Sequence, residues 1–400
     1  MSALAGLKVA DFAWAVAGPQ VGRMLADFGA TVVRVESSSR LDTTRQQGPF
    51  YGGKYDVQRS ALYDNCNANK LGLTLDMTQA QGRDIARQLA LWADVLVESF
   101  RPGQMAKFGL DYATLAAESP GLIMVSSSLL GQTGPHSSFG GFGNIGAALG
   151  GFQQITGLPD TPPVGPYGAY TDFPAPRMAL IALLAALDER RRTGRGRHID
   201  VSQVEAAATF LAPEIADAAA TGRVKAAQGN RDAAIAPNVV LRTAGADEWV
   251  AISARSDAEW GQLADMIGGA ALEPRYASLA GRQADETAVE ALLATWALTQ
   301  TAQQVEDRLQ AAGIAAHKIA APADVMADAH LNARGCFVHL PHPAGADTLF
   351  EASRCELSAT PAEYIRPAPS FGRDSPDILG DLLGLDAAHI AELGAQGVLK

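Results

Sequence analysis

One carboxylate, Asp172, lies in a sequence context in which it could act as a catalytic group. It lies in the Gly- and Pro-rich stretch 165–176, beside an apolar segment that we expect to form a helix from about Arg177. Backbone N–H groups at the start of a helix lack helical partners and favour a nearby negative charge. An ionised carboxylate held there can act as a nucleophile toward an activated carbonyl group. The position is also typical of an N-cap, and the two roles are compatible.

Short motifs surround Asp172 in a specific order along nearly the whole chain. Two of them are Asp94-Val-Leu-Val-Glu-Ser-Phe-Arg-Pro-Gly103 and Gly131-Gln-Thr-Gly-Pro135. The others lie at residues 7–12, 17–19, 25–36, 69–70, 73–76, 108–112, 192–196, 200–202, 229–231, 333–335, 358–361 and 379–385. In this order the motifs resemble the class III CoA-transferase family, which contains formyl-CoA and carnitine CoA-transferases and, as a relative, 2-methylacyl-CoA racemase.

The resemblance implies a reaction for Asp172. A class III CoA-transferase moves CoA from an acyl-CoA thioester to a carboxylic acid acceptor through an aspartyl anhydride and an aspartyl-CoA thioester, and Asp172 matches the family's nucleophile. This chemistry needs no metal and no permanently bound organic cofactor, since CoA enters as part of the substrate. The family also forms interlocked homodimers, so the resemblance implies that assembly too.

The family pattern further implies which residues bind CoA. Val16 and Ala17 match positions on the nucleotide, and Leu75 matches one beside the adenine. The remaining implied contacts are Ser37, at a position that is often basic, Ser99, Phe100 and Arg101 after a strand, and Lys107, at a phosphate-contacting position. Arg101 could pair with a phosphate through two hydrogen bonds, although an exposed arginine after a strand is often purely structural.

The chain departs from the family pattern near its nucleophile. Gly143 stands where formyl-CoA enzymes carry an acidic residue, and their tetraglycine loop is absent from residues 252–256. Formate and oxalate are therefore not the expected substrates. Phe142 stands where racemases carry a histidine, and His136 reads as a surface loop residue. Racemisation of a 2-methylacyl-CoA remains the alternative activity, but it needs a general base within reach of the α-carbon.

Residues 141–146 spell G-x-G-x-x-G, a pattern typical of dinucleotide-binding loops. No strand is expected directly before it, and no acidic residue follows at the end of a second strand. An NAD-dependent dehydrogenase is therefore a weaker alternative. A non-catalytic subunit or a simple acyl-CoA binding module would not need a carboxylate at position 172, so neither is favoured.

The composition is that of a globular protein with two domains. The chain has 400 residues, of which 48% are hydrophobic and 19% charged, and a net charge of −11, which argues against a polyanion-binding surface. Three scattered cysteines favour neither a disulfide framework nor a zinc site. No stretch resembles a signal peptide or a membrane span, so we expect a cytoplasmic protein that binds neither membranes nor nucleic acids.

Alternating strand and helix patterns predict an α/β fold with a Rossmann-like parallel-sheet large domain. Strands are expected at 7–12, 31–35, 95–97 and 121–127, and helices at 20–28 and 79–93. A hairpin over 238–253 and helices at 257–267, 288–298 and 301–312 predict a smaller α+β domain. Beyond it we expect a turn-rich stretch at 341–346 and a helical tail from Ala387. The predicted domains are residues 1–222 and 223–320, with a C-terminal segment, 321–400, that returns to the large domain.

Overall fold

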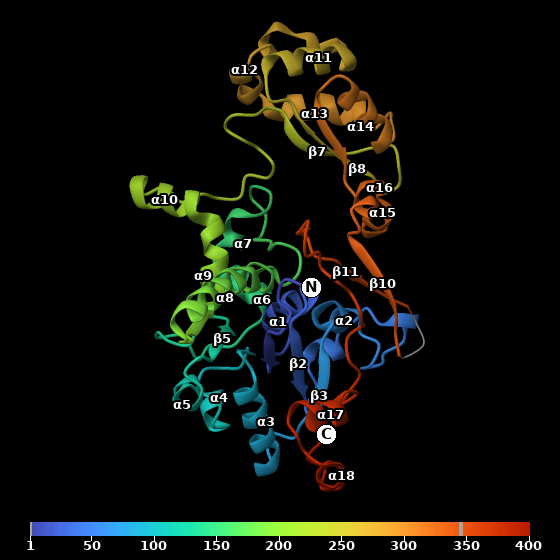
Figure 1. Cartoon of the computed structure of the whole chain (residues 1–400). Helices are drawn as coiled ribbons and strands as arrows, with labels where there is room; N and C mark the ends of the chain where they lie inside the picture. The colour runs from blue at the N-terminus through green and yellow to red at the C-terminus, as the bar shows by residue number, and fades with distance from the viewer. Residues whose placement is uncertain (1, 344–346) are drawn as a thin grey trace. The chain divides into compact units, whose positions relative to one another are not determined.

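The computed structural model describes residues 2–343 and 347–400, and the chain folds into two compact units (Figure 1). The larger unit comprises Met1–Gln153, Gly165–Val224 and His330–Lys400, and the smaller one Gln154–Val164 and Lys225–Ala329. The chain therefore leaves the larger unit twice. The domain limits expected after residues 222 and 320 stay predictions, because compactness alone does not define a folding domain.

A six-stranded parallel sheet forms the centre of the larger unit, in the order β3-β2-β1-β4-β5-β6. Its strands are β1 (Lys8–Asp11), β2 (Thr31–Glu36), β3 (Leu71–Thr74), β4 (Val95–Glu98), β5 (Ile123–Ser128) and β6 (His198–Ser202). The predicted parallel α/β sheet is confirmed, and β3 and β6 are additions to it. The order of the strands reverses between β1 and β4, and in open parallel sheets ligands bind at the carboxyl ends of strands near such a reversal.

Helices cover both faces of this sheet, which is why its strands are apolar on both sides. On one face Leu73 and Leu96 pack with residues of α3 (Ala80–Trp92) and α5 (Tyr112–Glu118). On the other face Val9 and Val97 pack with α1 (Ala17–Asp27) and α8 (Pro174–Thr193). Burying each such side chain contributes about 2 kcal/mol, so the two layers hold the strand ends in fixed positions.

The C-terminal segment lies against β3, the edge strand of the sheet. The backbone N–H of Gly72 donates to Asp374 Oδ2 at 2.8 Å, and the N–H of Asp76 donates to the carbonyl of Val398 at 2.8 Å. A hairpin of β10 (Phe337–Pro341) and β11 (Asp347–Glu351) precedes this segment, so the turn expected at 341–346 lies partly outside the described residues. The expected helical tail is α18 (Ala387–Ala395).

The remaining elements of the larger unit connect these layers. They are η1 (Thr43–Gln46), η2 (Tyr51–Gly53), α2 (Ala61–Asn67), α4 (Gln104–Lys107), α6 (Gly143–Leu149), η3 (Tyr170–Asp172), α9 (Gln203–Ala208), η4 (Thr209–Leu211), α10 (Ala212–Thr221), α17 (Ser375–Asp377) and η7 (Ile378–Leu382). Two short helices lie where the chain passes between the units, α7 (Phe152–Ile155) and α16 (Ala329–Ala333).

The smaller unit has its own core of Val250, Ile252, Leu263 and Leu293, among others. Its antiparallel sheet has the order β7 (Asn238–Arg242), β8 (Trp249–Ser253) and β9 (Ala315–Lys318). Its helices are α11 (Asp257–Ile267), η5 (Gly269–Leu272), η6 (Pro274–Tyr276), α12 (Leu279–Ala284), α13 (Glu286–Ala297), α14 (Ala302–Ala311) and α15 (Pro322–Ala327).

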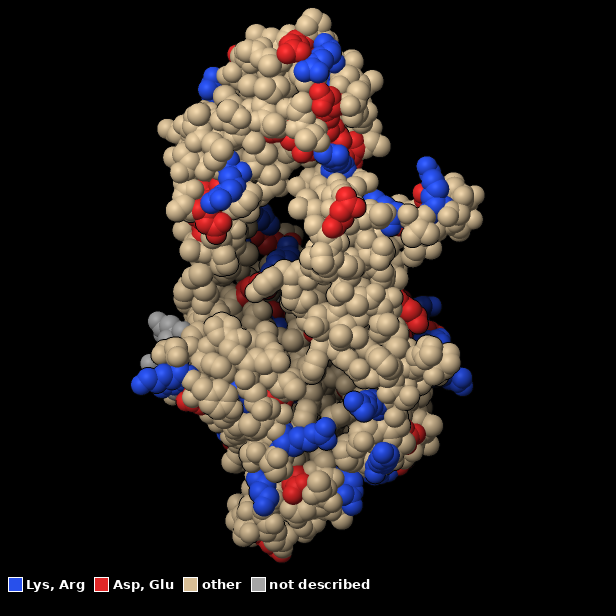
Figure 2. All heavy atoms as spheres, turned by 180° about the vertical axis from the view of Figure 1, so that it is seen from behind, with Lys and Arg blue, Asp and Glu red and all other residues tan. Residues whose placement is uncertain are grey.

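One face of the molecule carries scattered charged side chains (Figure 2). On the face drawn in Figure 2, Lys and Arg occur singly or in small groups, interspersed with Asp and Glu among uncharged residues. Such a distribution differs from the continuous basic stripe that binds nucleic acids. None of the helices in the described part of the chain is both long and apolar enough to cross a membrane.

Candidate active site

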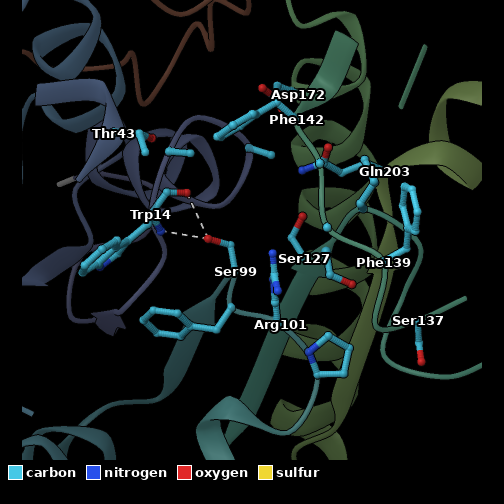
Figure 3. A pocket seen from close by; sticks show the side chains of 18 of the residues that line it. Trp14, Thr43, Ser99, Arg101, Ser127, Ser137, Phe139, Phe142, Asp172 and Gln203 are labelled. Atoms are coloured by element: carbon cyan, nitrogen blue, oxygen red, sulfur yellow. Dashed lines mark hydrogen bonds between the residues drawn. The ribbon is translucent and has the colours of Figure 1, made fainter. Parts of the chain in front are cut away.

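A cavity of about 430 Å³ opens at the carboxyl ends of the parallel strands (Figure 3). Its lining comes from the loops that follow β1, β2, β4 and β5, from η3 and from the first residue of α9. The residues are Trp14, Ala15, Ala17, Arg40, Thr43, Ser99, Phe100, Arg101, Pro102, Ser127, Ser128, Leu129, Ser137, Phe139, Gly140, Gly141, Phe142, Asp172 and Gln203. The strand order of the sheet thus brings together segments that are up to 189 positions apart in sequence, from Trp14 to Gln203.

Asp172 is the last residue of η3 and is 5% exposed. The long helix α8 begins two residues later at Pro174, and its N-cap is Phe173, which provides no side-chain cap. The carboxylate instead has the side-chain amide of Gln203 and the backbone N–H of Gly143 as neighbouring donors, and both lower its pKa. The N-cap role considered from the sequence is therefore wrong, because Phe173 and not Asp172 is the N-cap of α8.

Burial raises the pKa of Asp172 to about 7, against the opposing effect of the two neighbouring donors. A buried carboxylate loses the solvation of its charge, and two donors replace only part of it. Near neutral pH the group therefore exists in both forms. The anionic form is poorly solvated, which makes it more reactive toward an electrophile than a carboxylate in water.

Gln203 is a site residue that the sequence analysis missed. It is the first residue of α9, directly after β6, and is 9% exposed. The hydroxyl of Thr171 lies 3.2 Å from Gln203 Oε1 and 3.2 Å from the carbonyl oxygen of Gly143. Because the oxygen of the amide faces Thr171, its nitrogen is free to donate to Asp172. The motif at 200–202 pointed to this region, but not to this side chain.

Gly143 explains one departure from the family pattern. A Cβ atom at this position would lie 2.7 Å from the carbonyl oxygen of Ala169 and 2.9 Å from Cγ of Asp172. Both distances are too short for a real contact, so any side chain would displace the carboxylate. In this chain the position supplies a backbone N–H to Asp172, and it has no room for a second acid.

Several of the predicted CoA-binding residues meet in space. Ala17, Ser99, Phe100 and Arg101 line the main cavity with Asp172. A second cavity of about 110 Å³ adjoins the end of β2 and contains Ser37, Leu75 and again Phe100. Among the described residues that line the two cavities, Val16 and Lys107 are absent. Val16 is the N-cap of α1, between two lining residues, and Lys107 is exposed at the end of α4.

The two cavities share a wall that the sequence analysis did not predict. Trp14, Arg40 and Phe100 line both of them. The ring centroids of Trp14 and Phe100 are 5.8 Å apart, and the guanidinium of Arg40 lies 5.5 Å from the Trp14 ring centroid. Ser37 brings no positive charge to the smaller cavity, unlike the basic residue often found at this position. Its hydroxyl donates to the backbone oxygen of Lys400 at 2.9 Å.

A second buried acid, Glu98, ends β4 next to the cavity. It is 2% exposed, and burial raises its pKa to about 7. Its Oε2 accepts the backbone N–H of Phe100 at 2.8 Å, and this donor and the nearby hydroxyl of Ser126 both act to lower its pKa. Glu98 does not line the cavity itself, so it shapes the 99–101 loop rather than facing a ligand.

Phe142 lies at the cavity, and His136 does not. Phe142 lines the cavity and is 54% exposed, whereas His136 is exposed on the loop before it. Among the described residues that line the cavity, Asp172 is the only carboxylate, and there is no histidine. The described lining thus offers one carboxylate, together with hydroxyl groups, and no histidine to act as a second base.

The sequence is similar to those of several known proteins. The family model described as CoA-transferase family III matches residues 4–375. The chain is 32% identical to succinyl-CoA–D-citramalate CoA-transferase of Chloroflexus aurantiacus over 98% of this chain and 97% of that protein. It is 31% identical to succinate–glutarate CoA-transferase of Agrobacterium fabrum over 95% of each.

The structure is also similar to a solved one. A CAIB/BAIF family protein from Brucella suis superposes with a TM-score of 0.88 at 31% identity, covering 95% of this chain and 99% of that one. The resemblance seen in the sequence is confirmed, and so is the enzyme class. The chain belongs to CoA-transferase family III and is a CoA-transferase.

Proposed function

We propose that this enzyme transfers CoA from an acyl-CoA to a carboxylic acid with Asp172 as the nucleophile. The observation that carries the proposal is the buried Asp172 carboxylate, held by Gln203 and Gly143 at the wall of the main cavity. It is the group of the cavity that can attack a thioester carbonyl and later leave as a carboxylate.

The steps balance without any further reactant. Asp172 attacks the thioester carbonyl, the C–S bond breaks, and a mixed anhydride and CoA thiolate result. The thiolate then attacks the aspartyl carbonyl, which releases the donor acid and leaves an aspartyl-CoA thioester. The acceptor carboxylate attacks that thioester, giving a new anhydride, and the thiolate attacks its acyl carbonyl to release the new acyl-CoA and free Asp172.

The two adjoining cavities suggest how CoA is bound. We assign the smaller one, with Leu75 and Ser37, to the adenine end, and the main one to the pantetheine arm and the thioester. Arg40 and Arg101 line the main cavity, and neither makes an ion pair among the described residues. They can therefore pair with phosphate or carboxylate groups of the substrates. The Rossmann-like strand order of the sheet supports nucleotide binding at these strand ends.

The relatives named above act on dicarboxylic acids, which guides the choice of substrates. We infer that a short dicarboxylic acid accepts CoA here and that succinyl-CoA is a suitable donor. CoA exchange from succinyl-CoA should be measured against a panel of dicarboxylic, aromatic and simple monocarboxylic acids. Transfer to a dicarboxylic acid, abolished in Asp172→Ala, would support the proposal, and no transfer to any acid would contradict it.

Racemisation can be separated from transfer in one experiment. With Phe142 in the cavity and no histidine among its described lining residues, no second base faces Asp172. A 2-methylacyl-CoA incubated with the enzyme in D₂O should gain no α-deuterium above the non-enzymatic rate. Enzyme-dependent exchange without an acceptor acid, lost in Asp172→Asn, would instead assign the chain to the racemases.

We also propose that the protein is a cytoplasmic homodimer whose two chains interlock. The support is its membership of the family, together with the C-terminal segment that packs against β3. Light scattering at micromolar concentration should give the mass of two chains. A monomer under those conditions would contradict the proposed assembly.

A further inference from the structure

The conformation of Ala15 is unusual for its residue type. Its φ angle is 62°, in the left-handed region that alanine rarely adopts because its Cβ approaches the following carbonyl oxygen. Ala15 lines the main cavity between Trp14 and the N-terminus of α1. A strained residue persists only when the surrounding structure holds it.

Two side chains from different loops hold this segment. The N–H of Ala15 donates to Asp42 Oδ1 at 3.2 Å. The N–H of Trp14 donates to Ser99 Oγ at 2.8 Å, and the Ser99 hydroxyl donates back to the carbonyl of Trp14 at 3.0 Å. The segment is therefore fixed on both sides, by the loop after β2 and by the loop after β4.

Asp42 is itself held by a buried charged network. It is 0% exposed, and its Oδ1 also accepts the N–H and the hydroxyl of Thr44, each at 2.8 Å. Its Oδ2 pairs with Arg34, which is also 0% exposed and lies 3.8 Å from Asp11. Every oxygen of Asp42 is used, so its position is set before any ligand binds.

The conformation of Ala15 determines where the neighbouring Trp14 ring lies. This ring lines both cavities, and the Arg40 guanidinium and the Phe100 ring both lie close to it. In Figure 3 Trp14 stands beside Ser99, joined to it by the two dashed hydrogen bonds. If Ala15 relaxed to a right-handed conformation, the chain direction at Trp14 would change, and the shared wall of the two cavities would move.

We propose that Asp42 is a positioning residue for CoA: it holds Ala15 in the left-handed conformation and so places the wall formed by Trp14 and Arg40 between the two cavities. Asp42 lines neither cavity, and besides Ala15 it holds Thr44, which is next to the lining residue Thr43. The inference rests on the proposed function, since it assumes that CoA occupies these two cavities.

The test is the affinity of the full-length enzyme for CoA itself, measured by calorimetry. We expect Asp42→Asn to raise the Kd of CoA by about tenfold, the factor expected when one hydrogen bond to a charged group is lost. An asparagine cannot accept hydrogen bonds from both Ala15 and Arg34. Its amide nitrogen would face one of these two donors, and an amide nitrogen does not accept. The kcat at saturating acyl-CoA should change much less than the KM for acyl-CoA.

A second substitution distinguishes positioning from general damage. Glycine adopts positive φ at no steric cost, so Ala15→Gly should suppress most of the effect of Asp42→Asn, and the Kd of CoA should differ little between Ala15→Gly and the double variant. Asp27→Asn is the matched control, since Asp27 is also buried and pairs with Arg23 but lines neither cavity. This control should lower thermal stability without altering the Kd of CoA.

Each outcome decides the question. CoA binding by Asp42→Asn as tight as wild type, an equal loss in Asp27→Asn, or no suppression by Ala15→Gly would overturn the inference while the proposed function stands. Absence of CoA binding by the wild-type enzyme would overturn the proposed function first.

If Asp42→Asn does not fold, Thr44→Val removes one partner of Asp42 Oδ1 without unpairing Arg34. It should raise the Kd of CoA severalfold, and an unchanged Kd would overturn the inference.

Discussion

The side-chain amide of Gln203 lies near the carboxylate of Asp172 and lowers its pKa, so the end of β6 and the turn before α8 meet at this pair of residues. This neighbour matters because Asp172 is buried and its charge has few other partners. It favours the anion, which is the form that attacks a thioester, and it orients the oxygens of that anion.

Replacing Gln203 by leucine should shift the titration of Asp172 upward. Without the amide donor the carboxylate keeps only the N–H of Gly143, so the pKa of Asp172 rises further above about 7. A hydrogen bond to a charged group is worth about 1.5–3 kcal/mol, so activity at neutral pH should fall by roughly tenfold or more. The acid limb of kcat/KM should move to higher pH. A uniform loss at every pH would show that Gln203 does not act through Asp172.

The activity of the unmodified enzyme should depend on pH through Asp172. Since its pKa is raised to about 7, kcat/KM for acyl-CoA should rise from acid pH and level off above neutrality. Glu98 has a pKa of about 7 as well, so the same profile should be recorded for Glu98→Gln. Glutamine can still accept the N–H of Phe100, and the acid limb should persist. Its disappearance in Glu98→Gln would assign the limb to Glu98.

Gly143→Ala should damage the site strongly. The new Cβ would lie 2.7 Å from the Ala169 carbonyl oxygen and 2.9 Å from Asp172 Cγ, so the carboxylate must move. A displacement of about 1 Å can cost about a hundredfold in rate, and we expect a loss of kcat of that order. Gly394→Ala, in α18, is the control, because its Cβ would meet nothing within 4 Å. Equal activity of the two variants would contradict the geometry at Gly143.

Asp172→Asn should stabilise the protein in a pH-dependent way. A carboxyl whose pKa rises from 3.8 in the unfolded chain to about 7 in the folded one contributes stability at low pH that is lost as pH rises through about 7. Above that pH the wild type bears the full cost of the buried charge, at most roughly 4 kcal/mol at 1.4 kcal/mol per pKa unit. The melting temperature of Asp172→Asn relative to wild type should therefore be higher at about pH 8.5 than at about pH 5. An equal difference at the two pH values would show that Asp172 is not buried as a charge.

The strands of the parallel sheet that consist mainly of β-branched and apolar residues could be predicted from the sequence. Thr31–Glu36 and Ile123–Ser128 lie close to the expected ranges because their side chains are suited to a sheet buried on both faces. His198–Ser202 was missed, since its histidine and aspartate hide the strand pattern at the edge of the sheet. Ala315–Lys318 was missed as well, because alanine and lysine have low strand propensity.

The candidate site could be predicted only in part, for a physical reason. Asp172 was found because its position matched a family motif, but Gln203 carries no local signal, since its role depends on β6 lying beside β5. Trp14 and Asp42 are similar cases: their contact through Ala15 depends on a positive φ angle that no pattern of residue types reveals. The site depends on contacts between segments far apart in the sequence, whereas the helices and strands depend on local residue patterns.

The most direct test of the account is the fate of Asp172 during turnover. The enzyme should be incubated with succinyl-CoA, trapped with hydroxylamine or borohydride, digested and examined by mass spectrometry. The account predicts a modification on the peptide containing Asp172 that depends on acyl-CoA, and its absence, together with loss of CoA transfer, in Asp172→Ala. Modification at another residue, or full transfer activity in Asp172→Ala, would contradict the central claim that Asp172 is the nucleophile.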